Sequence, residues 1–353
     1  MSYPSKPKVF KWHLFARVID NFGDAGLAWR LARQLALDYQ QAVVLFLDSW
    51  ETLTLIEPRL VGSLAPMMLD GVTLLHWGSE FIGSPDIVLE VLGCRPPEGY
   101  LRQLIAQGKD FLWVDWEYLS AESWVESLHL TPSWQAEYHR NRYYFCPGFT
   151  PKTGGLLREK NLLAQQVDYR KTYPGNRVGP QRMLVFAYDL SPLWSLENAP
   201  EKPVEIWLLN SESCIAPLSS RWWVRPMVSQ VHFDTYLWSC DLNAVRGEDS
   251  FVRAQWAGVP MLWQIYPQEL DAHWVKLDAF LGHYLASASP SAKIAIKDLF
   301  YAWNGRGDVA PAWKNMLPHW REWQQLSCQW VSFLINQPDN GQQLMNFVGS
   351  MIS

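Results

Sequence analysis

The sequence predicts an α/β protein with two successive domains, each built on a parallel sheet. Three observations support this fold class. The chain has 353 residues, which is more than one hydrophobic core normally serves. Short apolar runs of β-prone residues alternate with segments of helical periodicity. This alternation starts again after residues 173–180, a stretch rich in proline and glycine, so we expect two Rossmann-like domains that face each other.

The first half opens with a strand, a loop, a helix and a second strand. Residues 9–18 are apolar and β-prone, and residues 20–24 have the composition of a turn. Leucines then recur every fourth residue with alanines beside them, which predicts an amphipathic helix over residues 25–39. Residues 43–48 are expected to form the next buried strand. Further strands of this half are expected at residues 86–92, 111–115 and 143–149.

The second half shows the same alternation without repeating the sequence. A helix over residues 249–257 is expected between strands at 240–245 and 260–265, and the tail from 310 to 352 is mostly helical in period. The other strands of this half are expected at residues 183–188, 204–209 and 223–227. The expected domains are residues 1–172 and 181–335, with a C-terminal helix at 336–353 that packs back on the first domain.

Composition and charge exclude several classes of function. The formal net charge is −5, so we expect no binding of nucleic acid. There is no run of about 18 uncharged apolar residues, and the polar start lacks the apolar core of a signal peptide, so we expect a cytoplasmic protein with no membrane partner. The five cysteines lie far apart and the eight histidines form no ligand pair, which indicates reduced thiols and no metal site.

The aromatic residues allow two interpretations. Tryptophan is unusually frequent, with 21 residues, and such side chains stack on sugars and bases. The apolar segments around most of them favour core positions instead. Phe186 and Tyr188, at the end of an expected strand, are weaker candidates for flanking a nucleobase. The tryptophans expected in the core include Trp29, Trp113, Trp256 and Trp263.

The loop at residues 20–24 carries two acids at the carboxyl end of the first strand, where ligands bind in open α/β sheets. It matches neither the dinucleotide-binding nor the Walker pattern, and two carboxylates would repel a phosphate. We therefore expect this loop to face a cation, a hydroxyl or an amine. Asp20 is favoured as a functional residue, whereas Asp24 serves equally well as the N-cap of the following helix.

The second half has a similar corner at residues 246–250. A strand, a glycine turn and a helix start bring N–H groups and a partial positive charge to one place, which suits a diphosphate. Ser250 adds a hydroxyl donor and Arg246 a cation, while Glu248 requires a sugar hydroxyl or a positive charge on the acceptor. The alternative is a plain helix cap formed by Asp249 or Ser250.

Two long stretches carry a resemblance to a known family. Residues 17–36 read RVIDNFGDAGLAWRLARQLA, and residues 246–268 read RGEDSFVRAQWAGVPMLWQIYPQ. With DAHWVKLDAFL at 271–281 and FAYD at 186–189, in this order and spacing, the chain resembles the EarP family of protein-arginine rhamnosyltransferases over essentially its whole length. The two long motifs together are highly specific, whereas NFGD alone would not be.

This resemblance implies a GT-B fold, with two Rossmann-like domains facing a cleft, and an inverting, metal-independent glycosyltransferase. The implied donor substrate is dTDP-β-L-rhamnose, with no cofactor, and the implied acceptor is an arginine nitrogen of elongation factor P. A GT-B enzyme acting on a lipid or a glycan is the alternative. The implied catalytic acids are Asp20, Asp24 and Glu248. The implied donor-binding residues are Asn21, Phe22, Gly23, Phe186, Tyr188, Arg246, Asp249, Ser250 and Gln255.

An arginine acceptor would explain why acids line the first loop. A guanidinium stays protonated at neutral pH, so Asp20 and Asp24 would first orient it, and Asp20 would accept a proton late in the reaction. A protein acceptor also needs a docking surface. Candidates follow the strand at 111–115, and a buried strand end is the plain alternative. These candidates are Asp115, Trp116, Glu117 and Tyr118.

Overall fold

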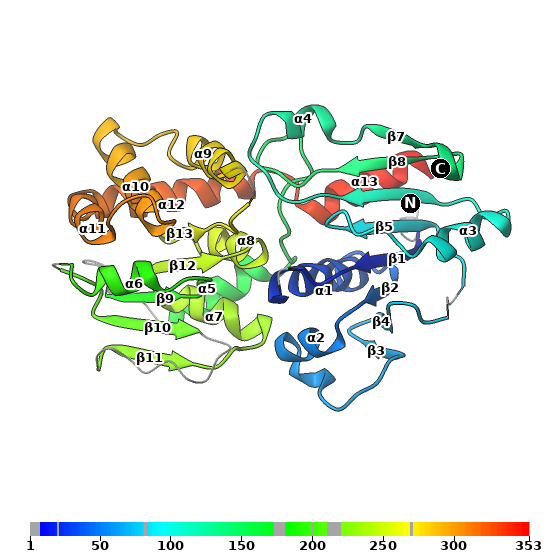
Figure 1. Ribbon diagram of the computed structural model, residues 1–353, viewed down its shortest axis with the longest axis horizontal. Coiled ribbons are helices and arrows are strands. Elements are labelled where there is room, and N and C mark those ends of the chain that lie inside the picture. The colour runs from blue at the N-terminus through cyan, green and yellow to red at the C-terminus, as the bar shows by residue number, and fades with distance from the viewer. Residues whose placement is uncertain are drawn as a thin grey trace, which may run out of the picture. The chain divides into compact units, whose positions relative to one another are not determined.

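The computed structural model describes residues 8–19, 21–80, 83–172, 181–199, 201–209, 220–268 and 271–352, with Asn21 and Phe22 as backbone only (Figure 1). The chain divides into two compact units. The first runs to residue 119, continues over 123–160 and returns at residue 338. The second comprises residues 120–122 and 161–337.

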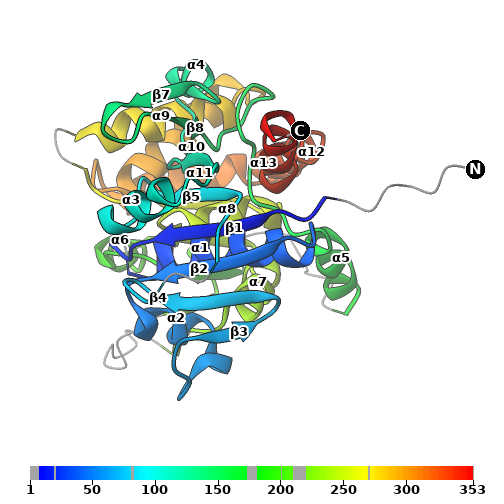
Figure 2. The same cartoon turned by 90° about the vertical axis from the view of Figure 1, so that its right-hand side faces the viewer.

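The described part of the first unit is built on an eight-stranded sheet in the order β3-β4-β2-β1-β5-β6-β8-β7. Figure 2 shows five of these strands, β5, β1, β2, β4 and β3, in that spatial order. Only the edge strands β3 and β7 are antiparallel to their neighbours, and the parallel strands follow the Rossmann order with a switch point between β1 and β5. The strands are β1 (Lys11–Ala16), β2 (Ala42–Leu47), β3 (Met67–Leu69), β4 (Val72–His76), β5 (Ile87–Val91), β6 (Leu112–Trp116), β7 (Pro132–Gln135) and β8 (Arg140–Phe145).

The helix α1 is the main helix of the first unit and packs on β1 and β2. Its leucines at 27, 31 and 35 are fully buried, as their four-residue spacing predicts. The last helix of the chain, α13, contacts α1 and belongs to this unit. The helices are α1 (Asn21–Leu37), α2 (Trp50–Ile56), α3 (Glu98–Ala106), α4 (Trp124–Leu128) and α13 (Asn340–Met351).

The described part of the second unit contains a fully parallel five-stranded sheet in the order β11-β10-β9-β12-β13. Its switch point lies between β9 and β12. The strands are β9 (Arg182–Val185), β10 (Glu205–Leu209), β11 (Trp222–Arg225), β12 (Leu242–Arg246) and β13 (Met261–Gln264). The helices are α5 (Leu162–Thr172), α6 (Ser191–Leu196), α7 (Gln230–Ser239), α8 (Asp249–Ala257), α9 (Ala272–Tyr284), α10 (Pro290–Trp303), α11 (Val309–Met316) and α12 (Trp320–Ile335).

The division between the units falls at residues 160 and 161 rather than at the expected residue 172. The helix α5 belongs to the second unit because its polar side chains bind there. Gln166 donates to the carbonyls of Trp256 and Ala257 at 2.9 and 3.1 Å, and Tyr169 shares a hydrogen bond with Ser239. The breaker-rich stretch at 173–180 lies outside the described residues.

Most of the secondary structure expected from the sequence has a counterpart in the fold. Every expected strand is present within a few residues of its expected position, whereas β3, β4 and β7 were not predicted. The four tryptophans expected in the core are buried, so that prediction is confirmed. Among the helices that are described, none combines the length and the apolar character needed to span a bilayer.

Candidate functional site

Two carboxylates fix the loop that follows β1. Asp24 Oδ2 accepts a hydrogen bond from the backbone N–H of Ile19 at 2.8 Å. Asp48, which follows β2, accepts one from the backbone N–H of Val18, also at 2.8 Å. Asp20, the expected proton acceptor, is the next residue in sequence but lies outside the described residues. The two residues that precede it, Val18 and Ile19, are therefore each held by a hydrogen bond to a carboxylate.

Asp24 does not have the N-cap position that its sequence context suggested. The helix α1 begins at Asn21, so Asp24 lies within the first turn, where it is 5% exposed. Residues with turn composition are compatible with a helix start, because the first N–H groups have no intrahelical partner. An acid in this turn is also favoured by the helix dipole. Gly23 is half-buried in the same turn, and the side chains of Asn21 and Phe22 are not described.

A buried ion-paired triad lies on β5, β6 and β8, three successive strands on one side of β1. Arg142 Nη1 on β8 binds Glu90 on β5 at 2.8 Å and Asp115 on β6 at 2.9 Å. Glu90 also accepts a hydrogen bond from Trp113 Nε1 at 2.9 Å. Glu90 stands opposite Phe15 of β1 in the sheet register, so this triad lies within the sheet just before the carboxyl edge.

One member of the triad, Asp115, is also one of the residues expected to form the docking surface. Burial, and then the charges of Glu90 and Glu117, raises the pKa of Asp115 to about 7. Asp115 is 2% exposed, and the equally buried Trp116 donates to Asn340 Oδ1 at 3.0 Å. These two residues are interior, so they cannot form a docking surface, because strand β6 stays covered to its end. Glu117 is half-buried and Tyr118 is exposed, so both stay candidates.

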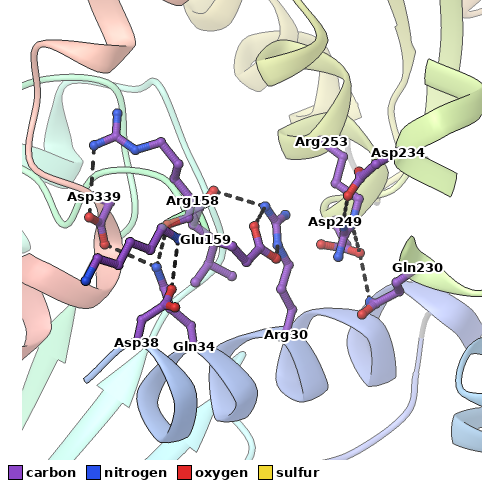
Figure 3. A network of polar contacts seen from close by, with 12 residues as sticks. Arg30, Gln34, Asp38, Arg158, Glu159, Gln230, Asp234, Asp249, Arg253 and Asp339 are labelled. Carbon is purple, nitrogen blue, oxygen red and sulfur yellow. Dashed lines mark hydrogen bonds and ion pairs between the residues drawn. The ribbon is translucent and has the colours of Figure 1, made fainter. Parts of the chain in front are cut away.

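A polar network on α1 anchors the two segments by which the chain leaves and re-enters the first unit (Figure 3). Arg30 is buried and binds Glu159 through Nε at 2.6 Å and Nη2 at 2.8 Å. Gln34 Nε2 donates to the carbonyl of Arg158 at 2.6 Å and to Asp339 Oδ1 at 3.2 Å. One side chain of α1 thus holds both crossing segments, which the sequence motifs did not indicate.

The predicted donor-side residues of the second unit gather at its switch point. Phe186 and Tyr188 follow β9, and Arg246 ends the neighbouring strand β12. The guanidinium of Arg246 lies 4.5 Å from the ring centroid of Phe186 and 4.6 Å from that of Tyr188. Phe186 is 6% exposed, so its ring is held between the core and a cation rather than open to a base. Cation–π contacts of this kind keep the Arg246 side chain at the carboxyl edge of the sheet.

The turn from β12 into α8 has the features expected of an anion-binding corner. Gly247 has φ of 62°, in the left-handed region that favours glycine. Glu248 is the N-cap residue of α8 and makes no capping hydrogen bond with its side chain. Ser250 lies in the first turn and is half-buried. The plain capping role considered for Asp249 is wrong, because Asp249 is already inside the helix.

Asp249 belongs to a second buried ion-paired triad (Figure 3). Arg253, one turn further along α8, binds Asp249 Oδ2 through Nε at 3.0 Å and Asp234 of α7 through Nη1 at 2.8 Å. Gln230, the first residue of α7, donates to the same Oδ2 of Asp249 at 3.2 Å. All four residues are buried. Sequence motifs did not single out Gln230, since 19 residues separate it from its partner.

Strand β13 holds both loops of this corner in place. Trp263 Nε1 donates to the carbonyl of Gly247 at 2.8 Å. Gln264 Oε1 accepts from the backbone N–H groups of Tyr188 and Asp189 at 2.6 and 3.0 Å, and its Nε2 donates back to the Asp189 carbonyl at 3.0 Å. The sequence motif contained both residues, but only the parallel pairing of β12 with β13 brings them to these loops.

Of the donor-binding residues predicted in the described part of the second unit, Gln255 is the one that lies away from this corner. It lies six residues beyond Asp249, about 9 Å along the helix axis. Its side chain is 2% exposed, and its Oε1 accepts from Trp330 Nε1 of α12 at 2.9 Å. The buried face of α8 thus directs Gln255 into the helical layer rather than to the helix start.

Comparisons with known proteins place the chain beside one family. The family model described as "Elongation-Factor P (EF-P) rhamnosyltransferase EarP" matches residues 12–349. A protein named protein-arginine rhamnosyltransferase from Pseudomonas putida KT2440 is 38% identical over 95% of this chain and 98% of its own length.

Solved structures extend the likeness to the fold. One is described as "Structural basis for EarP-mediated arginine glycosylation of translation elongation factor EF-P". It matches with a TM-score of 0.62 and 29% identity over 97% of this chain and 100% of that chain. The spinosyn forosaminyltransferase SpnP matches with a TM-score of 0.53 and 12% identity over 97% and 100%. The GT-B fold expected from the sequence is confirmed.

Proposed function

This chain belongs to the EarP family of protein-arginine rhamnosyltransferases, and on that premise we propose that it moves L-rhamnose from dTDP-β-L-rhamnose to an arginine of elongation factor P. The family match supports the class of enzyme, and the family description and the likeness to the EF-P glycosylation structure support the acceptor. The observation that carries the donor proposal is the β12–α8 corner, where a helix start, a hydroxyl and a cation meet.

The acceptor chemistry fits the acids after β1. A guanidinium has a pKa above 12, so removing its proton at pH 7 beforehand would cost roughly 7–9 kcal/mol. A carboxylate cannot supply that difference in the ground state. Asp24, and with it Asp20, would instead bind the cation by charge-assisted hydrogen bonds. Asp20 would take the proton as the nitrogen bonds to the anomeric carbon, because that bond makes the nitrogen acidic.

The donor chemistry fits the start of α8. Departure of a nucleoside diphosphate builds negative charge on the leaving group. The N–H groups at the helix start, the hydroxyl of Ser250 and the guanidinium of Arg246 would stabilise this charge. Glu248, beside them, would accept a hydrogen bond from a sugar hydroxyl or face the acceptor cation. Attack by the arginine nitrogen from the opposite side of the sugar inverts the anomeric centre.

Intact-mass analysis tests the proposal directly. Elongation factor P is incubated with the protein and dTDP-β-L-rhamnose, and a gain of one deoxyhexose is mapped by peptide sequencing. We expect it on an arginine. A deoxyhexose on another residue type, or no gain at all under conditions in which a characterised family enzyme modifies the same acceptor, would overturn the proposal.

Two variants separate the roles of the two corners. Asp20→Asn is expected to abolish transfer while dTDP binding stays within about twofold, because Asp20 is assigned to the acceptor. Ser250→Ala is expected to weaken dTDP binding first. Near-normal turnover by Asp20→Asn would refute the base assignment, and unchanged dTDP affinity in Ser250→Ala would refute the diphosphate assignment.

A further inference from the structure

The start of α8 presents a conflict of charge. Its N–H groups suit a diphosphate, yet the first residue of the helix is an acid, Asp249, with Glu248 immediately before it. An uncompensated carboxylate beside a diphosphate weakens binding by like-charge repulsion. The conflict is resolved within the second unit, because Arg253 lies one helical turn below and points its guanidinium at Asp249.

The guanidinium of Arg253 is buried and bound by two acids. Its side chain is 3% exposed, and two of its nitrogens bind two different acids, Asp249 on α8 and Asp234 on α7. Gln230 approaches the same oxygen of Asp249 from the first turn of α7. The orientation of the Asp249 carboxylate is therefore set by donors from two helices. A planar fork is needed for this geometry, and a lysine ammonium cannot reproduce it.

We propose that Arg253 is a positioning residue for the nucleotide donor: it neutralises and orients Asp249, so that the start of α8 receives a nucleoside diphosphate instead of repelling it. This inference rests on the proposed function, since it needs a diphosphate at this corner. It adds a residue that does not touch the donor. Arg253 acts through Asp249, and its two ion pairs join the N-terminal halves of α7 and α8.

A purely structural role would give different measurements. In that case replacing Arg253 would lower stability, and donor affinity would fall only as far as the protein unfolds. A positioning role predicts a loss of donor affinity in the folded protein, confined to the donor. It also predicts that removing the charge of Asp249 partly restores what the loss of Arg253 destroys.

The test measures dTDP binding by calorimetry and rhamnose transfer to elongation factor P for the full-length enzyme. The variants are Arg253→Lys, Arg253→Met, and Arg253→Met combined with Asp249→Asn. We expect Arg253→Lys to weaken dTDP binding about tenfold and to raise the KM for the donor, with the KM for the acceptor within about twofold. The double variant should bind dTDP at least about fivefold more tightly than Arg253→Met alone.

The matched control is Arg142→Lys in the first unit. Arg142 is also buried and also bridges two acids, Glu90 and Asp115, so its replacement should cost similar stability. Its dTDP affinity should stay within about twofold of the unmodified enzyme. Thermal unfolding of every variant shows which of them fold, and Arg253→Lys carries the test if Arg253→Met does not.

The outcomes are distinct. Normal dTDP affinity in folded Arg253→Lys, or an equal loss of affinity in Arg142→Lys, would overturn the positioning role while leaving the proposed function intact. A double variant no better than Arg253→Met would also overturn it, since the charge of Asp249 would then not matter. Failure of the unmodified enzyme to bind dTDP would instead refute the proposed donor, and the inference with it.

Discussion

The two units contain the same arrangement of charge at different places in the fold. In the first, Arg142 bridges Glu90 and Asp115 across strands β8, β5 and β6. In the second, Arg253 bridges Asp249 and Asp234 in the N-terminal halves of helices α8 and α7. Each guanidinium serves two buried carboxylates. The first triad lies between strands, and the second lies where N–H groups of a helix face outward.

This difference shows how location decides what a buried triad does. Between strands, the ion pairs of the triad join strands β8, β5 and β6 to one another, so the triad contributes rigidity to the sheet. At a helix start, the same charges also set the electrostatic potential seen by a ligand. We therefore expect the two triads to resemble each other in stability measurements and to differ in ligand binding.

The largest effect is expected from Arg142→Met. It leaves Glu90 and Asp115 buried without their cation, which should lower the free energy of unfolding by about 3–5 kcal/mol, measured by urea denaturation. Arg102→Met is the control, because Arg102 is paired but exposed, so its replacement should lower the free energy of unfolding far less. Equal losses of stability in the two variants would contradict this prediction, since burial of the ion pairs would then not matter.

The next effect concerns pH. Asp115 has its pKa raised to about 7 by burial and by neighbouring acids, whereas in the unfolded chain it is about 4. Between these values the folded protein keeps a proton that the unfolded chain has lost. Stability is therefore expected to fall as the pH rises from about 4 to about 7, by roughly 2–4 kcal/mol from this group. Unfolding of Asp115→Asn, measured across this range, should show a flatter curve. If stability depends on pH in the same way in Asp115→Asn and in the unmodified protein, Asp115 is not the group responsible.

A smaller effect is expected from Gln255→Leu. The change leaves the Trp330 indole N–H buried without its acceptor, which should cost about 1–2 kcal/mol. Because Gln255 is far from the helix start, dTDP affinity is expected to stay within about twofold by calorimetry. A tenfold loss of affinity in a folded variant would show that donor binding extends along α8 and is not confined to its start.

The smallest effect on stability is expected from Asp24→Asn, because the amide oxygen can still accept the Ile19 N–H. The change should cost less than about 0.5 kcal/mol, while Asp24→Ala should cost about 1 kcal/mol. Rhamnose transfer is expected to fall at least tenfold in both, because both remove the charge that would bind the acceptor. Transfer retained by Asp24→Asn alone would make Asp24 an anchor of the loop and nothing more.

The fold could be predicted from the sequence wherever the information is local. Strand β1 and most of helix α1 follow from an apolar run and from four-residue spacing, and the alternation of such segments gives the parallel sheets. Helix α1 begins four residues before the residue that the sequence predicts, because a turn and a helix start share the same residue types. The unit boundary was placed after α5, because the partners of Gln166 lie some 90 residues further along.

The site could be predicted only as far as the motifs reach. The acids and the glycine turn stand at strand ends, which sequence order alone predicts. The partners of these residues depend on packing between helices that are distant in sequence. The contact of Gln230 with Asp249 and the burial of Gln255 against Trp330 are of this kind. Residues on one helix look alike in a sequence until the neighbouring helix is known.

The return of the chain to the first unit has a consequence for synthesis of the protein. The helix α13 belongs to this unit, and its N-cap Asp339 accepts hydrogen bonds from Gln34 and Tyr39. A ribosome therefore completes residues 161–337 of the second unit before it delivers the last piece of the first. The unit made first is the one finished last, and a nascent chain stalled before residue 338 would leave the Asp339-binding end of α1 uncovered.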